Sequence, residues 1–124
     1  MKSSRMLTAI AAAALSASSM ATTYLFAVGI NDYATIYYED GDTAEMDLNG
    51  CVPDAKSYVS YFQNSGVVSP LNTVMLTDGA AAGANLVESM RQMFSKLVPG
   101  DKFIFTYSGH GTQIPSDFES DGLE

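Results

Sequence analysis

The chain has 124 residues, with 14 acidic side chains against six basic ones and a formal net charge of −8. This acidic balance argues against a nucleic-acid-binding protein and favours cationic partners. The length is sufficient for one domain with one modest hydrophobic core. A single cysteine excludes an internal disulfide framework, so Cys51 is predicted to be a free thiol.

The first 21 residues have the three parts of a secretory signal peptide. Lys2 and Arg5 form a basic leader, residues 6–17 are apolar and rich in alanine, and small residues precede a cleavage point after Ala21. The alternative is an uncleaved membrane anchor, but the apolar run is shorter than the roughly 20 residues that span a bilayer. We therefore expect residues 22–124 to form an exported domain, periplasmic or extracellular, with a net charge of −10 and no membrane attachment after cleavage.

The exported part begins with a predicted strand, an acidic loop and a helix. Residues 23–29 are a continuous apolar run that ends at a turn signal, which is typical of a buried strand. Residues 33–49 have no usable period and are predicted to be a loop; within it, residues 39–42 (Glu-Asp-Gly-Asp) either attract a cation or form a solvated acidic turn. Residues 53–64 carry an apolar stripe at helical spacing, and Gly66 is placed to end this helix.

A second strand, a second helix and a third strand follow. Residues 72–77 are predicted to be a strand, and Asn85 with Glu88 three positions later resembles a capping box that starts a helix. This helix should end before Pro99. Residues 103–107 are aromatic or β-branched, which predicts a strand buried on both faces. The apolar face expected of the second helix consists of Leu86, Met90, Met93 and Leu97.

The element order β-α-β-α-β predicts an α/β fold with a parallel sheet and right-handed crossovers. If the first strand lies between the other two, one helix covers each face, and a topological switch point falls between the first and third strands. The loop after the first strand, the start of the first helix and residues 108–111 would meet there. Cys51, Asp54 and His110 are therefore expected to be neighbours.

His110 is the leading candidate for a catalytic residue. It lies in Ser-Gly-His-Gly, residues 108–111, at the carboxyl end of a strand, where open α/β sheets bind ligands. Flanking glycines give the backbone a sharp path out of the strand, and an imidazole suits general acid–base catalysis near neutral pH. A structural histidine is the alternative. A hydrolase with Ser108 as nucleophile is disfavoured, because Gly-x-Ser-x-Gly is absent and the chain has no second histidine.

Three motifs together resemble the large-subunit half of a metacaspase, a caspase-like cysteine endopeptidase of clan CD. They are Phe-Ala-Val-Gly-Ile-Asn at 26–31, Leu-Asn-Gly-Cys-Val-Pro-Asp-Ala at 48–55 and Tyr-Ser-Gly-His-Gly-Thr-Gln at 107–113. Ser-Gly-His-Gly alone is shared by several caspase-like families, whereas the three motifs in this order are more specific. The resemblance covers essentially the whole exported part and implies a three-layer caspase-like fold.

The resemblance also implies roles for three residues. His110 matches the catalytic histidine, which polarises the scissile carbonyl and protonates the leaving amine. Asp54 matches an acidic residue of the primary specificity pocket, which implies cleavage after arginine or lysine and peptide partners with basic residues; its alternative role is a first-turn carboxylate that favours the helix dipole. Cys51 matches a second, non-essential thiol, which either packs inertly or substitutes weakly for the nucleophile.

One part of the family pattern is missing. The family's nucleophile is a cysteine in an Asp-x-Cys-like motif at the end of the next strand, and none follows His110 in this sequence. We therefore expect a caspase-like fold truncated after the third strand, inactive by itself, with residues 103–107 at a sheet edge. The alternative function is a non-catalytic caspase-like module that binds a partner or a basic peptide.

A calcium site is a further expectation. Asp117 and Asp121 belong to a run of alternating acids before a glycine, as in oxygen-rich calcium loops. The run also resembles the acidic segment that follows the histidine in metacaspases, many of which are calcium-activated. A solvated acidic tail is the alternative.

Overall fold

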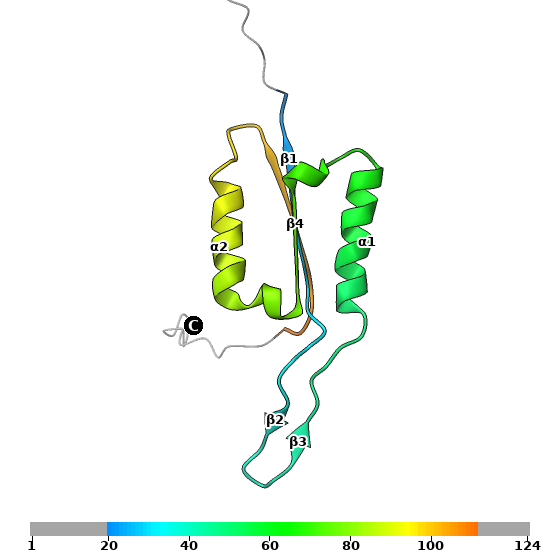
Figure 1. The fold of residues 1–124 in the computed structure, drawn as a ribbon, viewed down its shortest axis with the longest axis vertical. Helices are drawn as coiled ribbons and strands as arrows, with labels where there is room; N and C mark the ends of the chain where they lie inside the picture. Colours follow the sequence, from blue (N-terminus) through cyan, green and yellow to red (C-terminus); the bar gives the residue numbers. More distant parts are fainter. Residues whose placement is uncertain (1–19, 112–124) are drawn as a thin grey trace, which may run out of the picture.

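The computed structural model describes residues 20–111. A parallel sheet in the order β4-β1-β5 consists of β4 (Thr73–Thr77), β1 (Thr23–Gly29) and β5 (Lys102–Ser108). The helices α1 (Cys51–Asn64) and α2 (Gly83–Phe94) lie on opposite sides of this sheet (Figure 1). The predicted α/β class, the central position of the first strand and the placement of one helix on each face are confirmed.

The core is built around β1, whose residues Leu25, Phe26, Ala27 and Val28 are fully buried. Alternate residues of a strand face opposite sides, so Phe26 and Val28 share one face, where they pack with Met93 of α2. The other three residues of the predicted apolar face also pack against this cluster, although α2 ends at Phe94 and Leu97 follows it. Leu25 and Ala27 point to the opposite face, the face on which Gly29 lies against Cys51 and Ala55 of α1.

The β5 strand corrects one expectation. It was predicted to be buried on both faces, yet the side chains of Phe105 and Tyr107 are 46% and 45% exposed. The reason is position: within residues 20–111, β5 pairs only with β1 and therefore forms an edge of the sheet. The expected sheet edge is present, and apolar composition alone did not distinguish an edge strand from a central one.

The first helix begins at Cys51, two residues before the predicted start. Its N-cap residue, Gly50, has no side chain that could accept a hydrogen bond. A side chain from the turn after β1 caps the helix instead. The Asn31 side-chain oxygen accepts hydrogen bonds from the backbone N–H groups of Cys51 (2.9 Å) and Val52 (3.2 Å). The predicted terminator, Gly66, follows the helix with φ of 73°, in the left-handed region that favours glycine.

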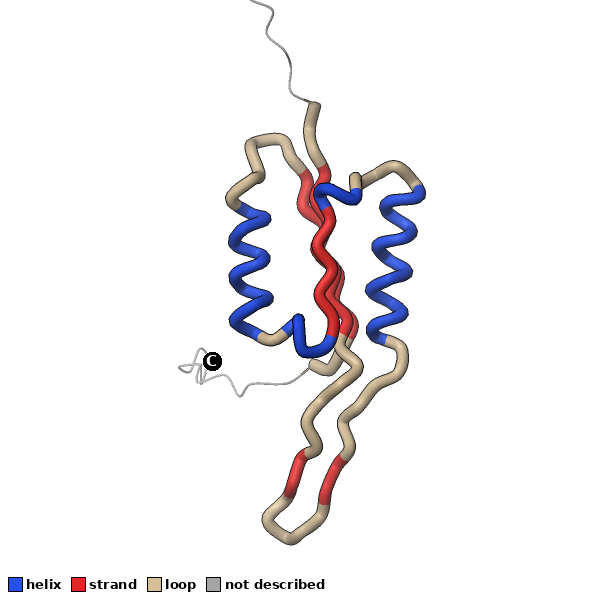
Figure 2. The backbone as a smooth tube through the Cα atoms, viewed as in Figure 1, coloured by secondary structure: helices blue, strands red, loops and turns tan. Residues whose placement is uncertain are grey.

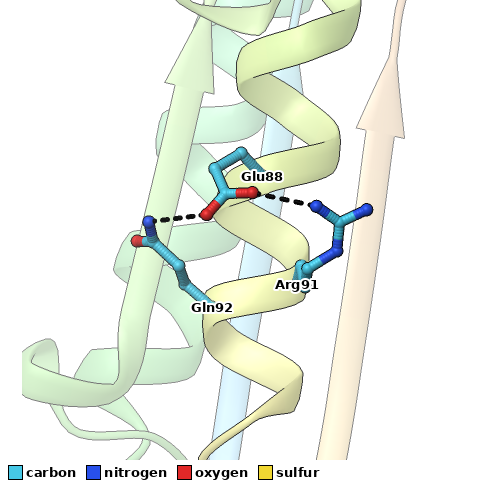
Figure 3. A network of polar contacts seen from close by, with 3 residues as sticks. All are labelled: Glu88, Arg91 and Gln92. Atoms are coloured by element: carbon cyan, nitrogen blue, oxygen red, sulfur yellow. Dashed lines mark hydrogen bonds and ion pairs between the residues drawn. The ribbon is translucent and has the colours of Figure 1, made fainter.

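The predicted capping box of α2 is wrong. The helix begins at Gly83, so Asn85 already lies in its first turn, and its amide Nδ2 donates to the Ala80 carbonyl at 2.6 Å. Ala80 belongs to the short 3-10 helix η2 (Asp78–Ala81), and another such turn, η1 (Pro70–Asn72), precedes β4. Glu88 pairs with Arg91 at 3.0 Å and accepts from Gln92 at 3.1 Å, so its carboxylate is used on the helix surface (Figure 3).

The stretch predicted as one loop, residues 33–49, contains a small antiparallel hairpin formed by β2 (Ile36–Tyr37) and β3 (Thr43–Ala44). It projects away from the sheet, beyond the ends of the strands (Figure 2). Residues 39–42 form its exposed acidic tip. Among residues 20–111 no group of three or more His, Cys, Asp or Glu side chains is arranged to hold a metal ion.

Residues 1–19, and with them most of the expected signal peptide, lie outside the described residues. Within residues 20–111, no helix has the length and apolar character needed to cross a bilayer.

Candidate active site

The candidate site lies at the carboxyl ends of β1 and β5. The register pairs Gly29 with Ser108, and the Ile30 N–H continues the pairing by donating to the Ser108 carbonyl at 3.0 Å. The start of α1 reaches the same place, because the Ser108 hydroxyl donates to the Asp54 carboxylate at 2.8 Å. The expectation that the beginning of α1 and the segment around His110 meet at one end of the sheet is therefore confirmed.

The half-buried imidazole of His110 is held by the backbone of the segment that follows β3. Its Nε2 atom lies 2.7 Å from the Met46 carbonyl oxygen. A carbonyl oxygen can only accept, so Nε2 must carry the hydrogen, and in the neutral ring Nδ1 keeps its lone pair. Nδ1 makes no hydrogen bond within residues 20–111, so this nitrogen can exchange a proton with a bound group.

Two tyrosines hold the backbone of His110. The His110 N–H donates to the Tyr33 hydroxyl at 2.8 Å, and the Tyr107 hydroxyl donates to the His110 carbonyl at 2.8 Å. The Tyr33 ring also packs edge-on against the imidazole, with centroids 4.6 Å apart. A Cβ at position 109 would lie 2.7 Å from the Tyr107 hydroxyl and closer still to that of Tyr33, so Gly109 is required by the close approach of both hydroxyls.

Tyr107 is neutral across the physiological range. The close approach of the Tyr33 hydroxyl, followed by partial burial and by the charge of an ionised Tyr33, raises the pKa of Tyr107 to about 12. The neutral hydroxyl keeps the proton that it donates to His110.

Asp54 presents an exposed carboxylate in the first turn of α1. Its neighbours form an open depression of about 390 Å³ that is lined, besides Asp54, by Ser57, Tyr58, Tyr61 and Phe62. Within residues 20–111 the only ion pair joins Arg91 to Glu88. No basic side chain in this range therefore pairs with Asp54. A carboxylate beside tyrosine rings can bind a cationic side chain through charge and through cation–π contact.

Cys51 is a free thiol, as predicted, and is buried at 8% exposure. It is the first residue of α1. Within the described part of the chain, its thiol has no hydrogen-bond partner, and the Nε2 atom of His110 is engaged by Met46. The structure therefore shows no thiol–imidazole pair between these two residues.

Sequence reasoning missed several residues that shape the site. Asn31 had a usable signal, since it lies two residues after the buried strand β1, in a turn where a polar side chain often bonds to a neighbouring element. Asp78, with φ of 46°, accepts from the N–H groups of Asn31 (2.8 Å) and Asp32 (3.2 Å) and so fixes the same turn. Tyr33 and Met46 lie in a segment without periodicity and carried no signal.

The suggested calcium ligands, Asp117 and Asp121, lie outside the described residues, and a calcium site there stays a prediction.

Comparisons with known proteins agree with the motifs. Residues 26–124 match the family described as "Metacaspase, peptidase C14 domain". Metacaspase-2 of Trypanosoma brucei brucei is 33% identical over 103 residues, which cover 76% of this chain and 26% of that protein. Metacaspase-1A of Aspergillus oryzae is 32% identical over 80 residues, or 60% of this chain and 19% of that protein. The chain thus spans about a quarter or less of the length of these curated relatives.

Proposed function

Because this chain belongs to the metacaspase family, with a peptidase C14 domain, we propose that it supplies the histidine-bearing half of a cysteine endopeptidase site. One observation carries the proposal: the His110 imidazole stands at the carboxyl end of β5 with Nε2 on the Met46 carbonyl and with no hydrogen bond from Nδ1 to any residue of the described range 20–111.

The imidazole would act through Nδ1. In its protonated form, Nδ1–H can polarise the scissile carbonyl and then pass its proton to the departing amine nitrogen, which completes cleavage of the peptide bond. The Met46 carbonyl continues to accept from Nε2–H and stabilises the positive charge that the ring carries before this transfer.

The nucleophile would be a thiolate from outside these 124 residues. Cys51, the only cysteine of the sequence, is buried and is not paired with His110. We assign it a packing role at the start of α1. A separate thiolate is in keeping with relatives that are about four times as long as the matched part of this chain.

Asp54 would select substrates with arginine or lysine before the cleaved bond. The Ser108 hydroxyl holds one carboxylate oxygen, Oδ2, and the depression beside it is bounded by aromatic rings. A guanidinium forms two parallel hydrogen bonds with a carboxylate that is held in this way. The overall charge of −8 also attracts a basic peptide.

The test is peptidase turnover by the complete product of the gene that encodes these residues. We expect cleavage after arginine and lysine but not after aspartate, loss of at least about a hundredfold in kcat/KM for His110→Ala, and little change for Cys51→Ala. Asp54→Asn should raise the KM for the arginyl peptide. The control for the loss of charge alone is Asp32→Asn, because Asp32 is an exposed acid at the same end of the sheet.

Turnover by residues 1–124 alone that Cys51→Ala abolishes would contradict this assignment, because Cys51 would then be the nucleophile. A second function, a non-catalytic module that binds basic peptides, is favoured by the burial of Cys51. It is the better account if the complete product binds an arginyl peptide through Asp54 but does not cleave it.

A further inference from the structure

The hydroxyl groups of Tyr33 and Tyr107 meet over Gly109, 3.4 Å apart, and each also bonds to the backbone of His110. The two residues are 74 positions apart in the sequence. Tyr33 follows β1 and Tyr107 belongs to β5, so the contact joins the base of the hairpin to the edge of the sheet.

The directions of these hydrogen bonds follow from counting protons. A tyrosine hydroxyl has one proton, and that of Tyr107 is donated to the His110 carbonyl. Tyr107 must therefore accept in its contact with Tyr33, and Tyr33 accepts in turn from the His110 N–H. The result is a closed ring of three hydrogen bonds that runs from His110 N–H through Tyr33 and Tyr107 to His110 C=O. Every member donates once and accepts once.

The segments that flank the β2–β3 hairpin, at Tyr33 and at Met46 and Asp47, also hold the imidazole. The Tyr33 N–H donates to the Asp47 carboxylate at 2.8 Å, and Met46, next to Asp47, supplies the carbonyl that meets Nε2. The Tyr33 ring also packs against the imidazole in an edge-to-face arrangement. The backbone and the ring of His110 are thus both held by Tyr33 and the segment at Met46 and Asp47 to which Tyr33 is bonded.

We propose that Tyr33 and Tyr107 are positioning residues for His110: their closed hydroxyl ring fixes its backbone so that the imidazole keeps Nε2–H on the Met46 carbonyl and carries no hydrogen on Nδ1. The catalytic consequence rests on the proposed function, because the protonation of Nδ1 matters only if the ring transfers protons. The positioning itself is a property of the folded chain and is testable without any activity.

The test uses the fact that the sequence contains one histidine, so its two ring nitrogens are the only imidazole signals in a nitrogen-15 NMR spectrum. With the 124-residue chain carrying a histidine-free tag, at about pH 8, where a histidine is ordinarily neutral, Nε2 should appear as the proton-bearing nitrogen and Nδ1 as the bare one. A wild-type spectrum that shows the proton on Nδ1, or an exchanging mixture of the two neutral tautomers, would overturn the proposal.

The variants are Tyr33→Phe and Tyr107→Phe, which keep the aromatic rings and remove one hydroxyl each. In each case we expect the second tautomer to appear and the His110 amide to exchange with solvent about tenfold faster. Because the ring is closed, the double variant should lose little more than either single one. The matched control is Tyr37→Phe, whose side chain is 78% exposed on the hairpin and should leave the spectrum unchanged.

Retention of the wild-type tautomer and amide exchange in both variants would show that the ring does not position His110. Should Tyr33→Phe lose the dispersed spectrum of a folded chain, Tyr107→Phe decides alone, since its side chain is at the sheet edge and half exposed. A complete gene product without peptidase activity, together with the expected tautomer changes, would refute the proposed function and leave the positioning role intact.

Discussion

The Tyr107 hydroxyl gives the structure a testable dependence on pH. Its pKa is raised from 10.0 to about 12 in the folded chain, and ionisation would remove the hydrogen bond to His110. A group whose pKa is raised by folding stabilises the folded state fully at pH values below its pKa in the unfolded chain. This stabilisation is lost as the pH rises through its pKa in the folded chain. Tyr107 should therefore contribute to stability below pH 10, and this contribution should disappear by about pH 12.

The measurement is the melting temperature of wild type and Tyr107→Phe across this range. The wild-type advantage should shrink steadily as the pH rises, whereas Tyr37→Phe, exposed on the hairpin, should follow the wild type throughout. A difference between wild type and Tyr107→Phe that does not depend on pH would contradict the assignment.

At the scale of residues, the sequence was most informative where a side chain directly follows a strand or begins a helix. Parallel strands place their carboxyl ends together, so the meeting of the first turn of α1 with the segment around His110 could be predicted from element order alone. Tyr33 and Met46 could not, because their contacts with His110 depend on how residues 33–49 fold back on themselves.

At the scale of elements, the start of α1 depends on a residue outside the helix. The Asn31 side chain satisfies two of the N–H groups that a helix leaves free at its first turn. Asn31→Ala should cost about 1 kcal/mol in the free energy of unfolding, the usual effect of removing an N-cap side chain.

Urea denaturation measures this change, which should lower the midpoint and leave the slope unaltered. Asn49→Ala is the matched control, since Asn49 is exposed beside the same helix end and makes no side-chain hydrogen bond in the described residues. Equal midpoints for the two variants would show that Asn31 does not cap α1.

The elements themselves were predictable, and their ends less so. The helix and strand periods found all three strands of the sheet and both of the long helices, within about two residues at most ends. The capping-box pattern of Asn85 and Glu88 failed because the preceding 3-10 turn draws Asn85 back toward Ala80. The hairpin was missed because strands of two residues are too short to show alternation.

At the scale of the whole molecule, the described part is a sheet whose last strand has one unpaired side. Residues 20–111 place β5 at this edge, with Phe105 nearly half exposed. Exposed apolar edge strands favour pairing with a further strand. A next strand that ends in a cysteine would lie beside β5 and bring a thiol close to His110, which is what the proposed function requires.

The most direct test of this account is the coding sequence beyond codon 124. The proposed function predicts an open frame that continues into a further strand ending in Asp-x-Cys, so that a thiolate joins His110 at the carboxyl edge of the sheet. A verified stop with no such segment would contradict the peptidase and leave a caspase-like domain that binds basic peptides without cutting them.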